Sequence, residues 1–549
     1  MSLRIDNEKG IPSQTVEVAR SAFPGGNIYI TLREEFGMIF QDEEFRELYP
    51  RRGQPAETPW RLALITLLQF REDLTDRQAA DAVRSRIDWK YVLGLELNDP
   101  GFHYSVLCEF RTRLITGGAE QVLFDRILEL GKKCGLLKER GKQRSDSTYI
   151  VAAVRCMNRV ELVSETLFHV LDLLAQIDPS WLKMQVKSDW YERYRERMTS
   201  YRLPRTEKER LKFALTVGQD GSSLLMQIYA QTAPDYLRKL PAVETMRQIW
   251  VQNYYQEGET LYWRDEKNCP PCSLRIASPY DTDARRSTKK DLFWQGYKVH
   301  LSETCDRDTP NLITHVETTP STEQDTTSVD RIHSALAEKQ LLPSQHFVDA
   351  GYPSAEALAT SKSSFGIDLY GPVRPDITWQ AQDEQAFKLQ QFMIDWEKEQ
   401  ATCPMGKTSA HWMHGYGMRG KPYIQVRFRK QDCQVCTSRA KCTRTKAAFR
   451  NITLQPTKEQ HLALQTARER QKSKIFWETY SLRSGIEGTI DQAVDKLGMR
   501  RSRYRGMSKT HFQHLVTAAA INIQRMLSWL AEVPRSVTYQ SHFFALATA

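Results

Sequence analysis

Three side chains in the last quarter of the chain have the types and spacing of a group that could act on phosphate. Tyr480, Arg483 and Glu487 follow one another at i, i+3 and i+7, so they share one face if the segment is helical. A row of surface salt bridges is the plain alternative. Gly485 and Gly488 flank Glu487 although glycine disfavours helices, which suggests that another backbone or a ligand comes close at this point.

Two aspartates are placed where an α/β sheet usually carries its chemistry. Asp349 follows the short apolar run that starts at His346 and precedes a glycine turn, so we expect its carboxylate at the end of a strand. It could instead cap the following helix. Asp146 precedes the apolar run 149–151 and is expected on an earlier strand. Each aspartate is weak evidence when taken alone.

A run of cations without acids extends from residue 496 to residue 509. It could be a solvated loop. Its preference for arginine, an interleaved tyrosine and two glycines favours close contact with phosphate groups, which makes nucleic acid the leading partner. Lys298, on the polar face of a predicted strand, is added to these candidates. The candidate DNA-binding residues are Lys298, Lys496, Arg500, Arg501, Arg503, Tyr504, Arg505 and Lys509.

Four cysteines form a second group with possible chemistry. Cys403, Cys433, Cys436 and Cys442 have the spacing C-x29-C-x2-C-x5-C. Four thiolates are suited to a structural Zn²⁺ ion, which would stabilise a small insertion lacking a large core of its own. Four ordinary reduced thiols are the alternative. The C-x2-C pair at Cys269 has two prolines between its cysteines and no obvious second pair, so its metal binding is left open.

The central part of the chain predicts an α/β sheet. Apolar residues alternate with polar ones from 297 to 301, and further strands are expected at 312–317, 346–349 and 367–370. Helical spacing at 329–336 and 355–360 separates the last three of these strands. The order strand, helix, strand, helix, strand is typical of an α/β sheet with right-handed crossovers.

Residues 1–135 are expected to be mainly helical. Thr58 followed by Pro59 is a helix start, and Thr75 with Gln78 forms a capping box at the start of the next helix. Short helices joined in this way are similar to a helix-turn-helix. Pure packing explains them equally well, so contact with DNA by this region stays open.

Composition excludes several classes of protein. The chain has 549 residues, a formal charge of +10 and 40% hydrophobic residues, which favours a folded, moderately basic protein over a disordered one. Ten cysteines are too sparse for a disulfide scaffold. No secretory signal is expected, and the apolar stretch 514–530 contains Asn522 and Arg525, so we expect a core helix there. A cytoplasmic location without membrane association is the expectation.

At these residues the sequence resembles the DDE-type transposases of bacterial insertion sequences. The resemblance covers most of the chain and lies in the order of its motifs: DST at Asp146, SPYD at 278–281, GYKVHL at 296–301, VDAGY at 348–352 and YSLRSGIEGT at 480–489. The basic segment 500–514 and AAAINIQRM after it match the usual tail. Many relatives place a lysine seven positions after the glutamate, where this chain has Val494, so Lys496 or Arg500 would have to replace it.

The resemblance implies a ribonuclease-H-like α/β catalytic domain over residues 136–549, preceded by a helical DNA-binding and assembly domain at 1–135. A helical insertion at 155–280 and a cysteine-bearing insertion at 375–470 would interrupt the catalytic domain. Asp146, Asp349 and Glu487 would hold two Mg²⁺ ions, with Mn²⁺ as a substitute, while Tyr480 and Arg483 fill the other places of the Y-x2-R-x3-E signature.

The expected function is therefore that of a transposase. It would bind the terminal inverted repeats of its element as a homodimer or higher oligomer and would cleave and join DNA strands, including target DNA, near the bacterial nucleoid. Two alternatives remain: a Mg²⁺-dependent structure-specific nuclease, and a catalytically retired regulator that binds DNA. The presence of all three acids favours an enzyme over a regulator.

Overall fold

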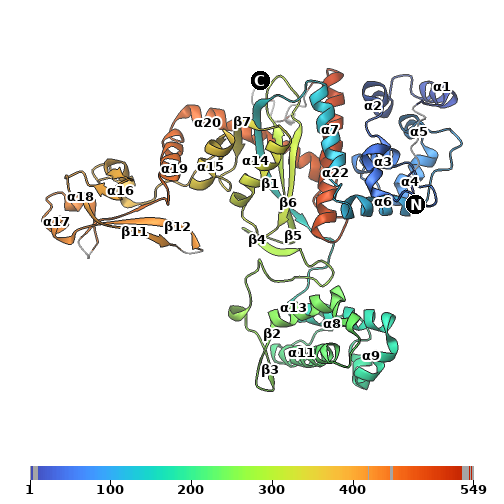
Figure 1. Ribbon diagram of the computed structural model, residues 1–549, viewed down its shortest axis with the longest axis horizontal. Helices are drawn as coiled ribbons and strands as arrows, with labels where there is room; N and C mark the ends of the chain where they lie inside the picture. The colour runs from blue at the N-terminus through green and yellow to red at the C-terminus, as the bar shows by residue number, and fades with distance from the viewer. Residues whose placement is uncertain are drawn as a thin grey trace.

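The computed structural model describes residues 2–3, 10–417, 420–445, 449–534, 543 and 546 (Figure 1). A mixed sheet lies at its centre, and three other parts extend from the sheet in different directions. The N-terminal helices lie beside the long helix α22. A helical insertion and a cysteine-bearing insertion lie at two further sides.

The central sheet has six strands. Five of them follow the order β4-β5-β1-β7-β8, and the sixth, β6, pairs with the half of β5 that does not pair with β4. Strand β5 is antiparallel to β1, β4 and β6, whereas β7 is parallel to both β1 and β8. The strands are β1 (Arg140–Val151), β4 (Arg285–Lys289), β5 (Leu292–Thr304), β6 (Ile313–Pro320), β7 (Pro343–Val348) and β8 (Asp368–Tyr370). The expected α/β class is confirmed, and the sheet is mixed.

The predicted alternation of strands and helices is also confirmed. Helix α14 (Ser328–Glu338) connects β6 to β7, and α15 (Ala355–Phe365) connects β7 to β8. Helix α15 begins at Ser354, whose side chain accepts a hydrogen bond from the Ala357 N–H, and ends at Gly366 in a left-handed conformation. Local capping chemistry therefore explains both ends of this helix.

Helix α22 (Met507–Leu530) joins the sheet to the N-terminal helices. It packs against β6 on one side and against α3 and α7 on the other, and Phe70 and Phe512 meet edge to face. Asn522 bonds both the N–H and the C=O of Ile313, so its polar atoms are satisfied inside the protein. The prediction of a core helix is confirmed. Within the part of the chain that the structure describes, no helix is long and apolar enough to cross a membrane.

The N-terminal region is helical, as predicted. Helix α3 begins at Pro59 after Thr58, and the capping box of Thr75 and Gln78 opens α4. Its large apolar side chains share one continuous hydrophobic core with the sheet and α22. The helices are α1 (Ser13–Ala22), α2 (Ile28–Phe36), α3 (Pro59–Arg71), α4 (Asp76–Ser85), α5 (Ile87–Leu93), α6 (Ser105–Thr116) and α7 (Val122–Lys133).

The helical insertion follows β1 and has a hydrophobic core of its own. Trp181, Trp190 and Trp250 are buried in that core. Its elements are α8 (Arg159–Ile177), α9 (Pro179–Gln185), α10 (Ser188–Arg193), α11 (Glu207–Tyr229), α12 (Asp235–Arg238), α13 (Pro241–Asn253) and the hairpin of β2 (Tyr254–Glu257) and β3 (Thr260–Trp263). The chain then enters the sheet again at β4.

The cysteine-bearing insertion follows β8 and is built on the antiparallel sheet β11-β12-β13. Among its described residues, seven form a small buried core. Its elements are α16 (Trp379–Gln382), β9 (Met393–Asp395), β10 (Gln400–Thr402), β11 (Ser409–Tyr416), β12 (Pro422–Phe428), α17 (Lys430–Gln434), α18 (Arg439–Cys442) and β13 (Asn451–Leu454). Helix α19 (Lys458–Arg470) returns the chain to the central sheet, where it packs against α15.

A buried carboxylate connects the sheet to the last helices. Glu303 on β5 is fully buried, and Arg144 opposite it on β1 donates to its Oε1 at 2.7 and 2.6 Å. The other oxygen accepts from Thr489 at 2.5 Å and from Arg525 at 2.8 Å. Thr489 lies on α21 (Gly485–Asp491) and Arg525 on α22. One side chain thus joins two strands to two helices.

We expect Glu303→Ala to destabilise the protein by about 3–5 kcal/mol, because it leaves two arginines buried without their common partner. Chemical unfolding followed by circular dichroism measures this loss. Glu192→Ala is the matched control. Glu192 is exposed and lies 4.0 Å from Arg195 at the surface, where an ion pair contributes about 0–1 kcal/mol. Equal stability of the two variants would refute the central role of Glu303.

Candidate active site

The pairing of β1 with β7 brings the two predicted aspartates together. Ser145 on β1 pairs with Val348 on β7 in parallel register. Asp146 is the next residue of β1 and Asp349 is the first residue after β7, so they lie near one another on paired strands, whose spacing is about 4.8 Å. More than 200 residues separate them in the sequence, and the sheet alone makes them neighbours.

Asp146 is held in a partly dehydrated position. Its Oδ1 accepts the N–H of Ser147 at 2.8 Å, and its Oδ2 is paired with Arg483. Burial raises the pKa of its carboxyl from 3.8 to about 6; Arg483 lowers the pKa and the nearby charge of Asp349 raises it. A carboxylate in this position gains from any additional cation that approaches.

Asp349 does not cap the following helix. That role belongs to Ser354, whereas Oδ1 of Asp349 accepts the N–H of Gly351 at 2.7 Å within the turn after β7. A side chain on Gly351 would meet Asp349 at 2.9 Å and Asp325 at 3.1 Å. Any larger residue at this position would displace these carboxylates, and the turn brings a further carboxylate, that of Asp325, close to Asp349.

Glu487 reaches the same place from the far end of the chain. The segment that carries it is a helix in three parts: α20 (Lys474–Tyr480), a 3-10 turn at Ser481–Ser484, and α21. Arg483 pairs with Glu487 at 2.6 Å and also with Asp146, so one guanidinium connects both acids. The side chain of Glu487 is 62% exposed. The predicted common face of Arg483 and Glu487 is confirmed by their contact.

Arg144 was not singled out in the sequence, although it precedes Asp146 by only two residues. Its guanidinium donates to the carbonyl of Leu482 at 2.7 Å, next to Arg483. A Cβ added to Gly485 would lie 2.0 Å from it. The close approach predicted at Gly485 is therefore made by a buried arginine, and it fixes the start of α21 against β1.

Gly488 differs from Gly485, because a Cβ added there would meet nothing within 4 Å. Asp491, one turn further along α21, is exposed and lines a separate cavity with Gln492 and Lys496. After Glu487, the helix face that carries Arg483 and Glu487 therefore turns away from Asp146 and Asp349.

Tyr480 is packed in a short stack of aromatic rings. Its ring lies parallel to that of Phe476 at 5.8 Å, and Phe476 lies parallel to Tyr370 on β8 at 4.8 Å. Burial raises the pKa of Tyr480, and Asp349, Asp146 and Glu487 raise it further. The ring is therefore fixed by packing, with its hydroxyl in the electrostatic field of the three acids.

Tyr352, in the turn that follows Asp349, is a second residue near the acids that the sequence did not single out. It is fully buried, and its hydroxyl bonds Nδ1 of His300 on β5 at 2.7 Å. Burial and the charges of Asp325, Asp146 and Asp349 hold its pKa well above the usual value. Its place in the VDAGY motif was the available signal.

The three acids fit a divalent metal ion as a donor set. Their oxygens are hard ligands from three elements, and the nearby charge of Asp349 raises the pKa of Asp146, which a shared cation would offset. Among the described residues, no three Asp, Glu, His or Cys side chains are already arranged as a metal-binding group. Arg483 supplies the counter-charge between Asp146 and Glu487.

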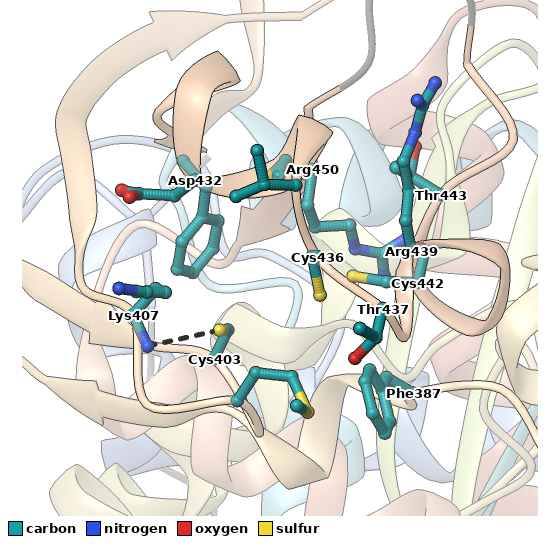
Figure 2. A pocket seen from close by; sticks show the side chains of 14 residues that line it. Phe387, Cys403, Lys407, Asp432, Cys436, Thr437, Arg439, Cys442, Thr443 and Arg450 are labelled. Atoms are coloured by element: carbon teal, nitrogen blue, oxygen red, sulfur yellow. Dashed lines mark hydrogen bonds between the residues drawn. The ribbon is translucent and has the colours of Figure 1, made fainter.

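The four predicted zinc ligands lie together in the cysteine-bearing insertion, whose elements α17, α18 and β11 extend away from β1 and β7 (Figure 1). Cys403, Cys433, Cys436 and Cys442 all line one pocket beside the small core of this insertion (Figure 2). Cys269 and Cys272 lie after the hairpin of the helical insertion, and Cys272 is exposed.

Two segments of the chain match known protein families. Residues 402–527 match a family described as "Transposase DDE domain", and residues 18–113 match one described as "Transposase domain (DUF772)". Both matches support the interpretation of the chain as a DDE-type transposase. The first match includes Glu487 and the four cysteines, while Asp146 and Asp349 lie outside both matched segments. Comparison with curated proteins and with solved structures gives no match.

The basic run of the transposase divides into two groups. Arg500 bonds Thr148 and the carbonyl of Tyr149 and stacks on the Tyr149 ring at 3.8 Å. Arg503 bonds the carbonyl of Leu74, pairs with Asp73 and covers Phe70. Tyr504 is largely buried beneath Arg111. These three predicted DNA-binding residues all have partners inside the protein.

The other cations of the run face outward. Arg501, Arg505, Lys509 and Lys496 are exposed. The backbone of Arg501 pairs with Val151 at the end of β1, which fixes this part of the run beside the catalytic strand. Lys298 differs from them: its ammonium group bonds Asp325 and the carbonyl of Glu323 at 2.9 and 2.6 Å, so it holds the loop next to Asp349.

A cavity of about 590 Å³ lies between the end of β1 and the helical insertion. Four arginines line it, namely Arg155, Arg197, Arg501 and Arg505, together with Tyr280. Arg197 and Arg505 both lie over the Tyr280 ring. Glu165 is the one acid among its lining residues, so the cavity has a strongly positive wall.

Gly485→Ala should destabilise the transposase by about 1–3 kcal/mol, because the new methyl group overlaps a guanidinium that Glu303 and Leu482 hold in place. Gly488→Ala is the matched control on the same helix. We expect it to be neutral or stabilising by up to about 1 kcal/mol, since the space is open and alanine favours helices. Thermal unfolding of both variants measures the difference, and a loss as large in Gly488→Ala would contradict the contact.

Proposed function

We propose that this transposase cleaves and joins DNA strands in a metal-dependent reaction at the terminal inverted repeats of a bacterial insertion sequence. The observation that carries the proposal is that Arg483 pairs with both Asp146 and Glu487, while the pairing of β1 with β7 brings Asp349 close to Asp146. A cation and a phosphate substrate would explain why three acids and an arginine gather in this part of the molecule.

A ribonuclease-H-like core is part of this proposal. Three antiparallel strands, β6, β5 and β1, are followed across the sheet by β7 and β8, which run parallel to β1. The helices α14 and α15 connect the last strands. This sheet supports the resemblance noted in the sequence, and it presents Asp146 and Asp349 at one edge.

The metal ligands would be the carboxylates of Asp146, Asp349 and Glu487, with Mg²⁺ as the expected ion and Mn²⁺ as a substitute. When bound, two such ions supply an activated water or 3′-hydroxyl and stabilise the leaving oxygen of an in-line displacement. Asp325 is the nearest further carboxylate, and its pairing with Lys298 favours a supporting role.

The chain's own residues would bind and orient the phosphate. Arg483 has a planar guanidinium suited to two oxygens of a phosphodiester, and on DNA binding it would exchange Asp146 and Glu487 for phosphate. Tyr480 would lie beside the cleaved strand with its ring fixed by Phe476. Arg144 and Glu303 would hold α21 so that Glu487 keeps its position.

Double-stranded DNA bound at the three acids would extend along β1 toward the arginine-lined cavity. Val151 is five residues beyond Asp146 on this strand, which is roughly 17 Å at about 3.3 Å per residue. A DNA strand covers that distance in about five nucleotides at about 3.4 Å each. Arg501 and Arg505 are therefore placed to neutralise backbone phosphates close to the cleaved bond.

Recognition of two transposon ends and of target DNA implies that a homodimer or higher oligomer assembles on DNA, in the cytoplasm at the nucleoid. A structure-specific nuclease would share the same acids, and a retired regulator would bind DNA without needing them. Joined products separate a transposase from both alternatives, because the nuclease only cuts and the regulator leaves the DNA intact.

Asp146→Asn, Asp349→Asn and Glu487→Gln should each lower Mg²⁺-dependent cleavage by about 1000-fold or more, because each removes a charged oxygen ligand. Binding to the same DNA should be nearly unchanged, since no phosphate contact is lost. Labelled duplexes carrying the element's terminal repeat measure cleavage and joining on gels, and fluorescence anisotropy measures binding.

Asp491→Asn is the matched control, because Asp491 is exposed on the same helix and lines a different cavity. It should cleave at the rate of the unmodified protein. Retained cleavage in any of the three variants would remove that residue from the set of metal ligands. A protein that cuts without joining would favour the nuclease.

Arg501→Ala combined with Arg505→Ala should weaken binding to DNA of any sequence and flatten its salt dependence. Each lost phosphate contact lowers the slope of log affinity against log salt by about 0.9 on duplex DNA, so a change of up to about 1.8 is expected. Anisotropy titrations at several salt concentrations measure the slope.

Arg503→Ala serves as the control from the same run. Because Arg503 contacts Asp73, Leu74 and Phe70, its loss should lower the melting temperature and leave the salt slope unchanged. If the double variant instead loses affinity only for the terminal repeat, with an unchanged slope, Arg501 and Arg505 read bases and do not serve as general phosphate contacts.

A further inference from the structure

The four cysteines of the cysteine-bearing insertion come from three separate pieces of chain. Cys403 lies in the turn between β10 and β11, Cys433 lies on α17 with Cys436 just after it, and Cys442 ends α18. All four nonetheless line the same pocket, and the sulfur atoms of Cys403, Cys436 and Cys442 lie around one space in Figure 2. All are free thiols.

The turn at Cys403 is shaped to present a sulfur atom. The N–H of Cys403 donates to the Lys407 carbonyl at 2.8 Å, and Gly406 has a left-handed φ of 76°. This geometry aims the Lys407 N–H at Sγ of Cys403, at 3.4 Å, which is the dashed contact in Figure 2. An N–H directed at sulfur favours the thiolate, which is the form that binds metal.

A partly buried positive charge lies next to the thiols. Arg450 lines the same pocket and bonds the carbonyl of Cys442 at 3.1 Å, while its Nε has no hydrogen-bond partner among the described residues. Thiolates formed here would therefore have this guanidinium as a counter-charge and the Lys407 N–H as a backbone donor.

The insertion has little else to hold this end together. Its buried core contains seven residues, and Cys403, Cys433 and Cys442 pack against the edge of that core. The helices α17 and α18 have only five and four residues. Helices this short are marginal without a cross-link. The four thiols line one pocket but are not close enough together to contact a single ion. Metal binding would therefore draw them inward and order the two helices.

We propose that Cys403, Cys433, Cys436 and Cys442 bind one structural Zn²⁺ ion through four thiolates. Four soft ligands around one pocket are suited to zinc, whereas the carboxylates of the candidate active site are suited to Mg²⁺. The site is separate from the acids and does not depend on the proposed DNA chemistry. Its role is to fold the outer end of the insertion, because binding energy at such a site is folding energy.

Full-length protein purified without chelator tests the proposal by elemental analysis. We expect one zinc per chain, falling to near zero in Cys436→Ser and in Cys403→Ser. Replacement by Co²⁺ should give the intense visible and near-ultraviolet bands of a tetrahedral tetrathiolate site. Because this spectrum is recorded on the unmodified sequence, it keeps the test valid if a serine variant fails to fold.

Cys269→Ser and Cys272→Ser are the matched controls and should retain the zinc. Limited proteolysis should become faster between residues 403 and 442 in Cys436→Ser or after removal of zinc, with the central sheet unaffected. Three outcomes would overturn the proposal: no zinc and no Co²⁺ bands in the unmodified protein, zinc retained without Cys403 and Cys436, or zinc lost only with Cys269 and Cys272.

Discussion

The buried carboxylate of Glu303 is the interaction on which the position of the active site depends. A fully buried charge is tolerated only if it is compensated, and here Arg144, Arg525 and Thr489 share it. Arg144 precedes Asp146 by two residues on β1, and Thr489 follows Glu487 by two on α21. The network therefore fixes Asp146 and Glu487 relative to each other through the buried charge of Glu303.

The acids themselves are a source of electrostatic strain. Asp146 and Asp349 lie on neighbouring strands, and burial raises the pKa of Asp146 to about 6. In the protein alone, Arg483 relieves part of the repulsion by pairing with Asp146 and Glu487. The four-residue spacing on one helical face is what allows Arg483 to reach Glu487 while it also pairs with Asp146.

The parts of this transposase are not equally independent. Helix α22 places the N-terminal helices and the sheet in one hydrophobic core, and Arg503 adds an ion pair to Asp73 across the same contact. The two insertions have cores of their own. Changes in the insertions should therefore remain local, whereas changes in α22 should affect both the N-terminal helices and the acids.

The sequence by itself determined the local structure. Proline, capping residues and glycine predicted where α3, α4 and the turn after β7 begin, and apolar periodicity predicted β5, α14 and α15, because these signals act over a few residues. The acids could be named only with the help of a resemblance. Only the tertiary structure decided that Ser145 pairs in register with Val348 and so places Asp146 beside Asp349, that Arg144 fills the space at Gly485, and that Arg500 and Arg503 face inward while Arg501 and Arg505 face outward. Strand register and burial depend on partners hundreds of residues away, and no periodicity within one segment records them.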